Sequence, residues 1–235
     1  MNNEKNTIGF ESAEILLPDF QKTDGTKWAV VACDQFTGDK EYWQKVDELS
    51  KDAFSTYNLT FPEIYLSQDN SERIKKINEN MVTYLEQGLF REINDAIIYI
   101  ERTLNNGKVR RGIVLACDLE EYEYKKGAKS LIRPTEGTIE DRLPPRVKIR
   151  ENAPLELPHI MLLVNDEEKL LIEKIDKSNL TLLYETDLMQ NGGSIKGWLV
   201  NKNEQNRIFE TLLKTDCKDG DNVIRLAVGD GNHSL

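Results

Sequence analysis

A glycine-rich run near the end of the chain contains residue types that bind phosphate: Gly229-Asp230-Gly231-Asn232-His233-Ser234. It directly follows the apolar residues 223–228, which predict a buried strand. Glycine lets a backbone approach a ligand closely, and free N–H groups at the start of a helix form an anion site. We therefore expect residues 229–234 to be a phosphate-binding turn that leads into a helix. A plain turn with a helix cap is the alternative interpretation.

The side chains of this run supply the polar groups that such a site needs. His233 can donate a hydrogen bond to a phosphoryl oxygen, and Asn232 and Ser234 add neutral donors. Asp230 can hold a metal ion or orient His233. A helix that starts at Asn232 or His233 would have almost no residues left in this chain. Since domains seldom end on an unfinished element, we expect the 235 residues to be the N-terminal fragment of a longer protein.

A second stretch that suits an anion runs from Arg133 to Arg150, where five basic residues face three acidic ones. Prolines and glycine interrupt it, as is typical of functional loops between strands. Arg142 and Arg146, four residues apart, can grip one anionic group, and Glu136 or Asp141 can act as a base or a metal ligand. The alternative is a solvated loop whose charges pair with one another.

The composition narrows the classes of partner. The net charge of −10 disfavours general binding to nucleic acid or to an anionic membrane, although a local basic patch can still bind one small anion. Three widely spaced cysteines fit neither a disulfide framework nor a zinc cluster. The sequence has no run of eighteen apolar residues and no signal-peptide pattern at its start, which predicts a cytoplasmic location. Assembly into a homo-oligomer is left open.

The N-terminal elements are predicted from apolar patterning. The continuous apolar run Trp28–Cys33 predicts a strand buried on both faces. Asp34 follows it, and since strand ends open onto clefts, Asp34 is a candidate metal or ligand contact. Apolar residues at helical spacing predict a helix over 39–55 and another that begins at Asp69 and ends near Gly88.

The remaining elements mix strands and helices without regular alternation. Two apolar runs joined by Asn105-Asn106-Gly107-Lys108 predict a hairpin over 96–117. Its second run, 113–118, nearly repeats 29–34, as an internal duplication or simply two buried strands of similar composition would. Further strands are expected at 159–164, 170–173, 180–184 and 195–200, and a helix at 204–213. This order predicts an α+β fold, a mixed sheet with flanking helices, in one domain over 1–235. A subdivision into 1–95, an N-terminal α/β part, and 96–235, a phosphate-binding part, stays open.

Several short motifs resemble, in type and order, those of the proteins grouped as domain of unknown function 1015. From Thr83 onward they are Tyr84-Leu-Glu-Gln-Gly-Leu-Phe90, Arg110-Arg-Gly-Ile-Val114, Leu119-Glu-Glu-Tyr122, Thr135-Glu-Gly-Thr138, Glu140-Asp-Arg142 and Gly229–Ser234. The run Lys27–Phe36 also resembles the start of one branch of that family. The family's Asp-Gly-His-His-Arg motif is in turn similar to the phosphate-gripping turn of the ParB and sulfiredoxin-like superfamily, which includes a free serine kinase.

This resemblance implies a ParB/sulfiredoxin-like core in the C-terminal part and a nucleotide phosphate at residues 229–234, with His233 as a donor. It also implies that Glu136, Thr138, Asp141 and Arg142 line the same cleft. Ser234 stands where the family motif has Arg, and Thr135 stands where the loop usually has His. Arg142 or Arg146 is expected to replace the missing charge.

The residues and the resemblance together lead to two hypotheses. The first is a nucleotide-dependent phosphotransferase, a kinase that uses Mg²⁺ with ATP or ADP and acts on a small hydroxylated metabolite. Glu136 or Asp141 would deprotonate the acceptor hydroxyl. The second is a non-catalytic module that binds a nucleotide or another small anion as a sensor. A scaffold without a ligand is a weaker third interpretation.

Overall fold

A computed structural model describes residues 8–32, 36–66, 70–157, 160–220 and 222–235. Its helices are α1 (Gly25–Trp28), α2 (Lys40–Ser50), α3 (Ser71–Glu86), α4 (Leu143–Arg150) and α5 (Lys202–Leu212). Its strands are β1 (Phe10–Glu11), β2 (Ala13–Pro18), β3 (Phe90–Ala96), β4 (Ile98–Thr103), β5 (Val109–Val114), β6 (Ala116–Cys117), β7 (Ile132–Pro134), β8 (Met161–Leu163), β9 (Thr181–Asp187), β10 (Ser194–Leu199), β11 (Cys217–Asp219), β12 (Asn222–Ile224) and β13 (Leu226–Asp230). The predicted α+β class is confirmed.

The largest sheet is antiparallel, with the strand order β5-β4-β10-β9. The predicted hairpin is its first pair, because β4 and β5 are joined at Asn105–Lys108 and Thr103 pairs with Val109. Gly107 has a φ of +79°, a left-handed conformation that glycine adopts without a steric cost. The strands expected near 180–184 and 195–200 are also confirmed, as the β9–β10 pair.

A second, mixed sheet has the order β7-β13-β8. Its central strand β13 pairs in parallel with β7 and antiparallel with β8. The single strand predicted over 223–228 is divided: Asn222–Ile224 form β12, which pairs with β11, and residues 226–228 belong to β13, where Leu226 and Val228 are buried as predicted. The central position of β13 places the glycine-rich run at the end of this sheet.

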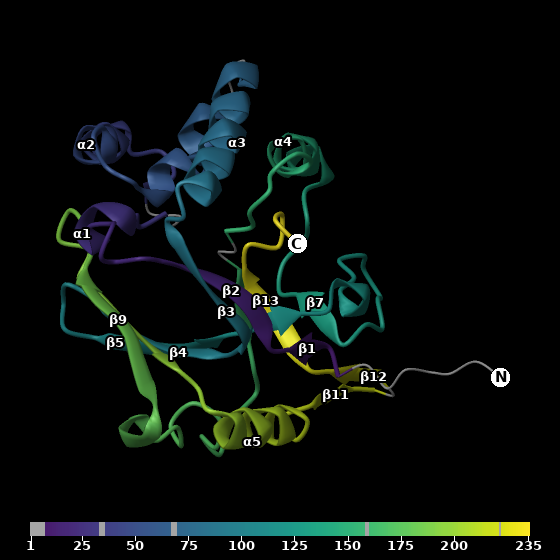
Figure 1. Cartoon of the computed structure of the whole chain (residues 1–235). Coiled ribbons are helices and arrows are strands. Elements are labelled where there is room, and N and C mark those ends of the chain that lie inside the picture. Colours follow the sequence, from purple (N-terminus) through teal and green to yellow (C-terminus); the bar gives the residue numbers. More distant parts are fainter. Residues whose placement is uncertain (1–7, 33–35, 67–69, 158–159, 221) are drawn as a thin grey trace.

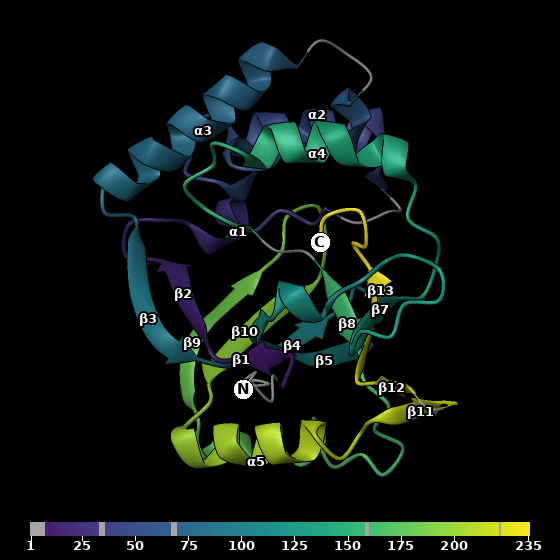
Figure 2. The ribbon, with the colours of Figure 1, turned by 90° about the vertical axis from the view of Figure 1, so that its right-hand side faces the viewer.

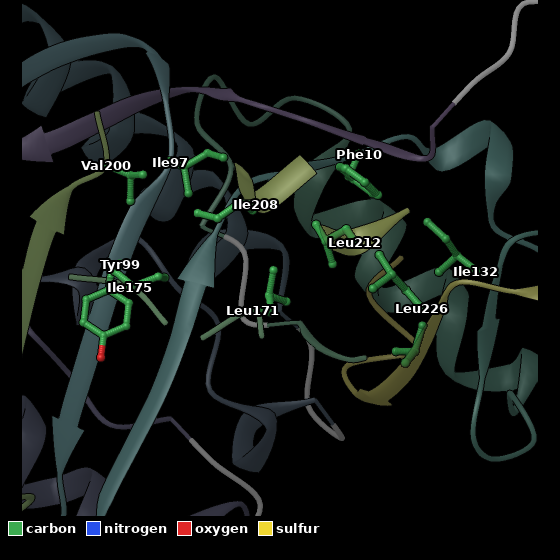
Figure 3. Close-up of a cluster of buried hydrophobic side chains, with 11 residues drawn as sticks. Phe10, Ile97, Tyr99, Ile132, Leu171, Ile175, Val200, Ile208, Leu212 and Leu226 are labelled. Carbon is green, nitrogen blue, oxygen red and sulfur yellow. The ribbon is translucent and has the colours of Figure 1, made fainter. Parts of the chain in front are cut away.

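The main hydrophobic core links the two sheets to α5 (Figure 3). It combines residues from both sheets, from β1 and from α5. They are Phe10 of β1, Tyr99 of β4 with Ile97 just before that strand, Ile132 and Leu226 of the mixed sheet, and Ile208 and Leu212 of α5. Ile208 is buried because it lies on the apolar face that the helical spacing of 204–213 predicts. The mixed sheet is therefore fixed to the rest of the molecule by apolar contacts from several distant segments.

The helices α2, α3 and α4 lie on the opposite side of the sheets from α5 (Figures 1 and 2). Two smaller clusters hold this layer: one gathers around Trp28, Ile77 and Met81, the other around Trp43 and Val46. The helix predicted over 39–55 is confirmed but ends at Ser50. The second helix also ends as predicted, since Gly88 has a φ of +60°, whereas its expected start at Asp69 lies outside the described residues.

The prediction of a strand over Trp28–Cys33 is wrong. Trp28 ends α1, and residues 29–32 form no strand. Side chains take the backbone groups that a sheet would use: Thr56 donates to the Trp28 carbonyl at 2.8 Å and Tyr42 to the Val31 carbonyl at 2.6 Å. The apolar run therefore reflects the packing of Trp28, Ala29 and Val30 in the helical layer, and residues 29–32 do not repeat the structure of residues 113–116. Asp34 lies outside the described residues.

The strand expected over 170–173 is also absent. The carboxylate of Asp166 accepts hydrogen bonds from the backbone N–H groups of Leu170, at 2.9 Å, and Leu171, at 2.7 Å. Arg207 of α5 donates to the carbonyls of the same two residues. Because side chains satisfy these backbone groups, Leu171 enters the core without a partner strand. Within the described ranges, no helix is long and apolar enough to cross a membrane.

Candidate functional site

The end of β13 and the segment after β7 lie side by side because their strands run parallel. The carbonyl of Val228 accepts two hydrogen bonds from Thr135, from its backbone N–H at 3.1 Å and from its hydroxyl at 2.8 Å. Parallel neighbours place their carboxyl ends at the same edge of a sheet, where ligands of open sheets bind. The glycine-rich run and the basic stretch are thus brought to one edge.

Two polar contacts then join the run 229–234 to residues 138 and 139. The side-chain amide of Asn232 donates to the Thr138 hydroxyl at 3.2 Å. The backbone N–H of Ile139 donates to Nε2 of His233 at 3.0 Å, across 94 positions of sequence. Asn232 is only 4% exposed, and the hydroxyl of Tyr122 donates to its carbonyl at 3.4 Å. Both views show the chain end between β13 and α4 (Figures 1 and 2).

The run forms a turn, and the helix expected to start at Asn232 or His233 is not formed. Gly231 has a φ of +84°, and the N–H of Ser234 donates to the Gly231 carbonyl at 2.9 Å. A non-glycine residue at this φ would be strained. The requirement for glycine at 231 is therefore a backbone requirement.

The requirement for glycine at 229 has a different cause, which is close packing against a neighbouring strand. A Cβ at this position would lie 2.9 Å from Cγ and Cδ1 of Leu163, on the neighbouring strand β8. The β8–β13 register also shifts between Val228 and Asp230, which leaves Gly229 at an irregularity in the pairing. The close approach that this glycine permits is to Leu163.

Gly229→Ala is expected to lower the free energy of unfolding by about 1–2 kcal/mol, because the added methyl group overlaps Leu163. Urea unfolding would measure the change. In the Leu163→Ala background the same substitution should cost much less, which a double-mutant cycle reports as a coupling energy. Equal costs in both backgrounds would show that Leu163 is not the cause.

The contact with Ile139 fixes how His233 can act. Since Nε2 accepts a hydrogen bond, the ring is neutral and carries its proton on Nδ1, which is the nitrogen left to donate to a ligand. Burial lowers the pKa of His233 below its ordinary value of 6.5, and the positive charges of Arg146 and Arg142 lower it further. Glu136 and Glu63 oppose this shift. The neutral ring is thus favoured by geometry and by charge.

We expect the stability of the fold to rise with pH just below the ordinary pKa of histidine. In that range the unfolded chain binds a proton at position 233 while folded His233 is neutral, so unfolding takes up a proton. The free energy of unfolding should therefore fall as the pH drops from about 7 to about 5. His233→Gln keeps an acceptor for the Ile139 N–H but does not titrate. Urea unfolding across this range should show a shallower pH dependence for the variant, and identical slopes would contradict the prediction.

Arginines at every fourth position follow one face of α4 from its N-cap: Arg142 is the N-cap residue, and Arg146 and Arg150 belong to the helix. Arg142 and Arg146 lie close enough to His233 to influence its pKa, and Arg150 donates to the carbonyl of Ser234. The sequence analysis singled out the first two and missed Arg150, although its spacing of four residues from Arg146 was a usable signal.

Two of these arginines already hold carboxylates. Arg146, whose side chain is 15% exposed, pairs with Glu63 of the short 3₁₀ segment Glu63–Tyr65. Arg150 pairs with Glu156 at 2.8 Å. The guanidinium of Arg142 makes no ion pair with any residue that the structure describes, and Arg142 is exposed. Arg142 is therefore the cation of this face that is available to an added anion.

The predicted acidic residues lie around the same edge but are spread out. Glu136, Asp141 and Asp230 are all exposed, with Asp230 at the last position of β13. In the described part of the chain, no group of three or more His, Cys, Asp or Glu side chains could hold a metal ion. A cation here would need ligands from outside the protein, such as phosphate oxygens.

A hollow of about 590 Å³ lies away from this edge, at the start of α5. Its charged side chains already have partners, since Arg207 pairs with Glu204 at 2.6 Å and Lys202 pairs with Asp95. Arg133, from the basic stretch, is likewise committed, to the carbonyls of Ser130 and Val223. The edge at β7 and β13 is the better candidate because Arg142, which lies there, makes no ion pair with the described residues.

Comparison with known proteins shows which family the chain belongs to. No curated protein and no solved structure gives a significant match to the chain. A family model described as "Protein of unknown function (DUF1015)" matches residues 18–235, a range that includes the β7–β13 edge, α4 and the turn. The chain therefore belongs to the DUF1015 family.

Proposed function

We propose that this protein is a nucleotide-dependent phosphotransferase that acts on a small hydroxylated metabolite, with Mg²⁺ and ATP or ADP as cofactors. It is supported by the two hydrogen bonds that join residues 229–234 to residues 138 and 139, beside Arg142 and Arg146. Glycine turns and arginines are common phosphate-binding groups. A ParB/sulfiredoxin-like core around β13 is part of the same proposal.

Each side chain has a definite task in this proposal. Nδ1–H of His233 and the guanidinium of Arg142 bind phosphoryl oxygens, with Arg146, Asn232, Thr138 and Ser234 around them. Mg²⁺ needs only one or two carboxylates when phosphates supply its other ligands, so Asp230 suffices from this edge. Asp34, the other proposed metal ligand, lies outside the described residues.

The reaction moves a phosphoryl group from the nucleotide to a hydroxyl oxygen. Glu136 or Asp141 accepts the hydroxyl proton while the oxygen forms a bond to the terminal phosphorus. The bond from that phosphorus to the bridging oxygen breaks, and the shortened nucleotide leaves with the bonding electrons. Both carboxylates are exposed, so an acceptor can reach either one from solvent.

The second candidate is a sensor that binds a nucleotide or small anion without turnover. The pairing of Arg146 with Glu63 and of Arg150 with Glu156 favours it, because two of the three arginines are neutralised within the protein. The two candidates share the binding site and differ only in phosphoryl transfer.

Thermal unfolding of the full chain with Mg²⁺ and ATP, ADP or no nucleotide tests both candidates. Ligand at 100 times its Kd stabilises the folded state by about 2.7 kcal/mol, which raises the Tm by about 5–10 °C for a chain of this size. No shift with either nucleotide would contradict the kinase and the nucleotide sensor, and would leave only a sensor of another small anion. A panel of hydroxylated metabolites would then separate the two: a kinase transfers the terminal phosphate of the nucleotide to one of them, and a sensor transfers it to none.

A further inference from the structure

A cavity of about 300 Å³ lies between the start of α3 and the face of α4 that adjoins its arginines. Its walls are mainly apolar: Phe61, Leu66 and Ile74 on one side, and Pro144, Pro145 and Ile149 on the other. Asn70 and Lys148 are its polar members. Small-molecule sites have volumes from about 300 Å³ and combine apolar walls with a few polar groups.

The cavity and the phosphate site share α4. Successive residues of a helix are about 100° apart, so Pro145 and Ile149 lie directly beside the face of Arg142, Arg146 and Arg150. The loop before α3 also contributes to both regions, because Phe61 lines the cavity and Glu63, two residues later, pairs with Arg146. A ligand that extends from the cavity to His233 would pass this ion pair.

The packing of α4 leaves room for such a ligand. None of its eight residues is buried, and it is tied to its surroundings through Arg146–Glu63, Arg150–Glu156 and the bond from Arg150 to Ser234. These polar contacts are all on the arginine face. The opposite wall is formed by Ile74 of α3 and by Phe61 and Leu66 from the segment before it, and α3 is held in the helical layer by its buried Ile77 and Met81. The cavity therefore has one firmly packed wall and one wall held by ion pairs.

We propose that this cavity binds the base of the nucleotide whose phosphates lie at Arg142 and His233. The inference rests on the proposed function and extends it, because it assigns the base of the nucleotide to a second, mainly apolar site beside the phosphate site. A base has two flat apolar faces and a polar edge. The rings of Phe61 and Pro145 suit the faces, and the amide of Asn70 suits the edge because it both donates and accepts hydrogen bonds.

Calorimetric titration of the full chain with Mg²⁺–ATP and, separately, with Mg²⁺–tripolyphosphate tests this inference. Tripolyphosphate has the phosphate chain without the base, so wild-type protein should bind ATP at least about 10-fold more tightly. Ile74→Phe fills the cavity and should weaken ATP binding by about 10-fold or more while tripolyphosphate binding stays unchanged. Val82→Phe is the matched control, since Val82 is 45% exposed two turns further along α3. It should leave both affinities unchanged.

The outcomes separate the two proposals. Equal affinities of the wild-type protein for ATP and tripolyphosphate, or an Ile74→Phe variant that binds ATP normally, would overturn the base site and leave the phosphate site standing. Failure of the wild-type protein to bind either compound would overturn both. If Ile74→Phe does not fold, as judged by circular dichroism, Ile149→Phe fills the same cavity from the α4 side.

Discussion

Arg142→Ala is expected to weaken the binding of Mg²⁺–ATP by about 30-fold, which corresponds to a loss of about 2 kcal/mol. Arg142, the N-cap residue of α4, makes no ion pair with the described residues, and its positive charge helps to lower the pKa of His233. Hydrogen bonds from a guanidinium to phosphate are charge-assisted and among the stronger ones in proteins. Calorimetric titration of wild-type and variant protein would measure the difference directly.

A matched substitution makes the result interpretable. Arg110 is also exposed but lies on β5, in the other sheet, so Arg110→Ala removes the same charge without touching the site. It should change the affinity by less than about 2-fold, through long-range electrostatics alone. Arg142→Lys should recover only part of the affinity, since a lysine cannot form a bidentate contact. If Arg142→Ala and Arg110→Ala behave alike, Arg142 does not bind the nucleotide.

Arg225→Met is expected to lower the free energy of unfolding by about 3 kcal/mol, the largest effect on stability that we predict. The side chain of Arg225 is 11% exposed, and its guanidinium holds the Asp216 carboxylate through two contacts, at 2.8 and 3.0 Å. It also donates to the carbonyl of Ile8 at 2.7 Å. The substitution leaves the Asp216 carboxylate partly buried without its counter-ion. Urea unfolding should show a lower midpoint with an unchanged slope.

An exposed ion pair supplies the contrast. Lys45 pairs with Glu41 at 2.7 Å, four residues earlier on α2, and both side chains are more than half exposed. Lys45→Met should therefore change the stability by no more than about 0.5 kcal/mol. A loss of less than about 1 kcal/mol for Arg225→Met would mean that water replaces the lost contacts.

The elements predicted from local periodicity are largely those that the structure contains. The helix with Trp43 and Val46, the hairpin around Gly107 and the second half of the strand predicted over 223–228 each follow from a pattern within about fifteen residues. Such patterns are reliable because an amphipathic helix or a tight turn is specified by its own residues. The prediction failed at 28–32 and 170–173 because an apolar run indicates that some of its side chains are buried, here Trp28, Val31 and Leu171, but not what its backbone bonds to.

The candidate site, like the fold, was predicted from the sequence only in part. The sequence by itself identified the run 229–234 and the basic stretch, because glycines, a histidine and spaced arginines have recognisable chemistry wherever they occur. It also placed the chain among relatives of one family through motifs in a fixed order.

Only the tertiary structure decided what these residues contact. The pairing of Arg146 with Glu63 joins positions 83 apart, and that of Arg150 with Ser234 joins positions 84 apart. No local pattern encodes such a pairing, because it depends on the parallel alignment of β7 and β13 and on where α4 lies relative to the layer of α2 and α3. The same alignment turns Nε2 of His233 toward Ile139 and leaves Nδ1 as the donor. Residue types thus determined the chemistry that is available, and long-range packing determined which atoms are free to perform it.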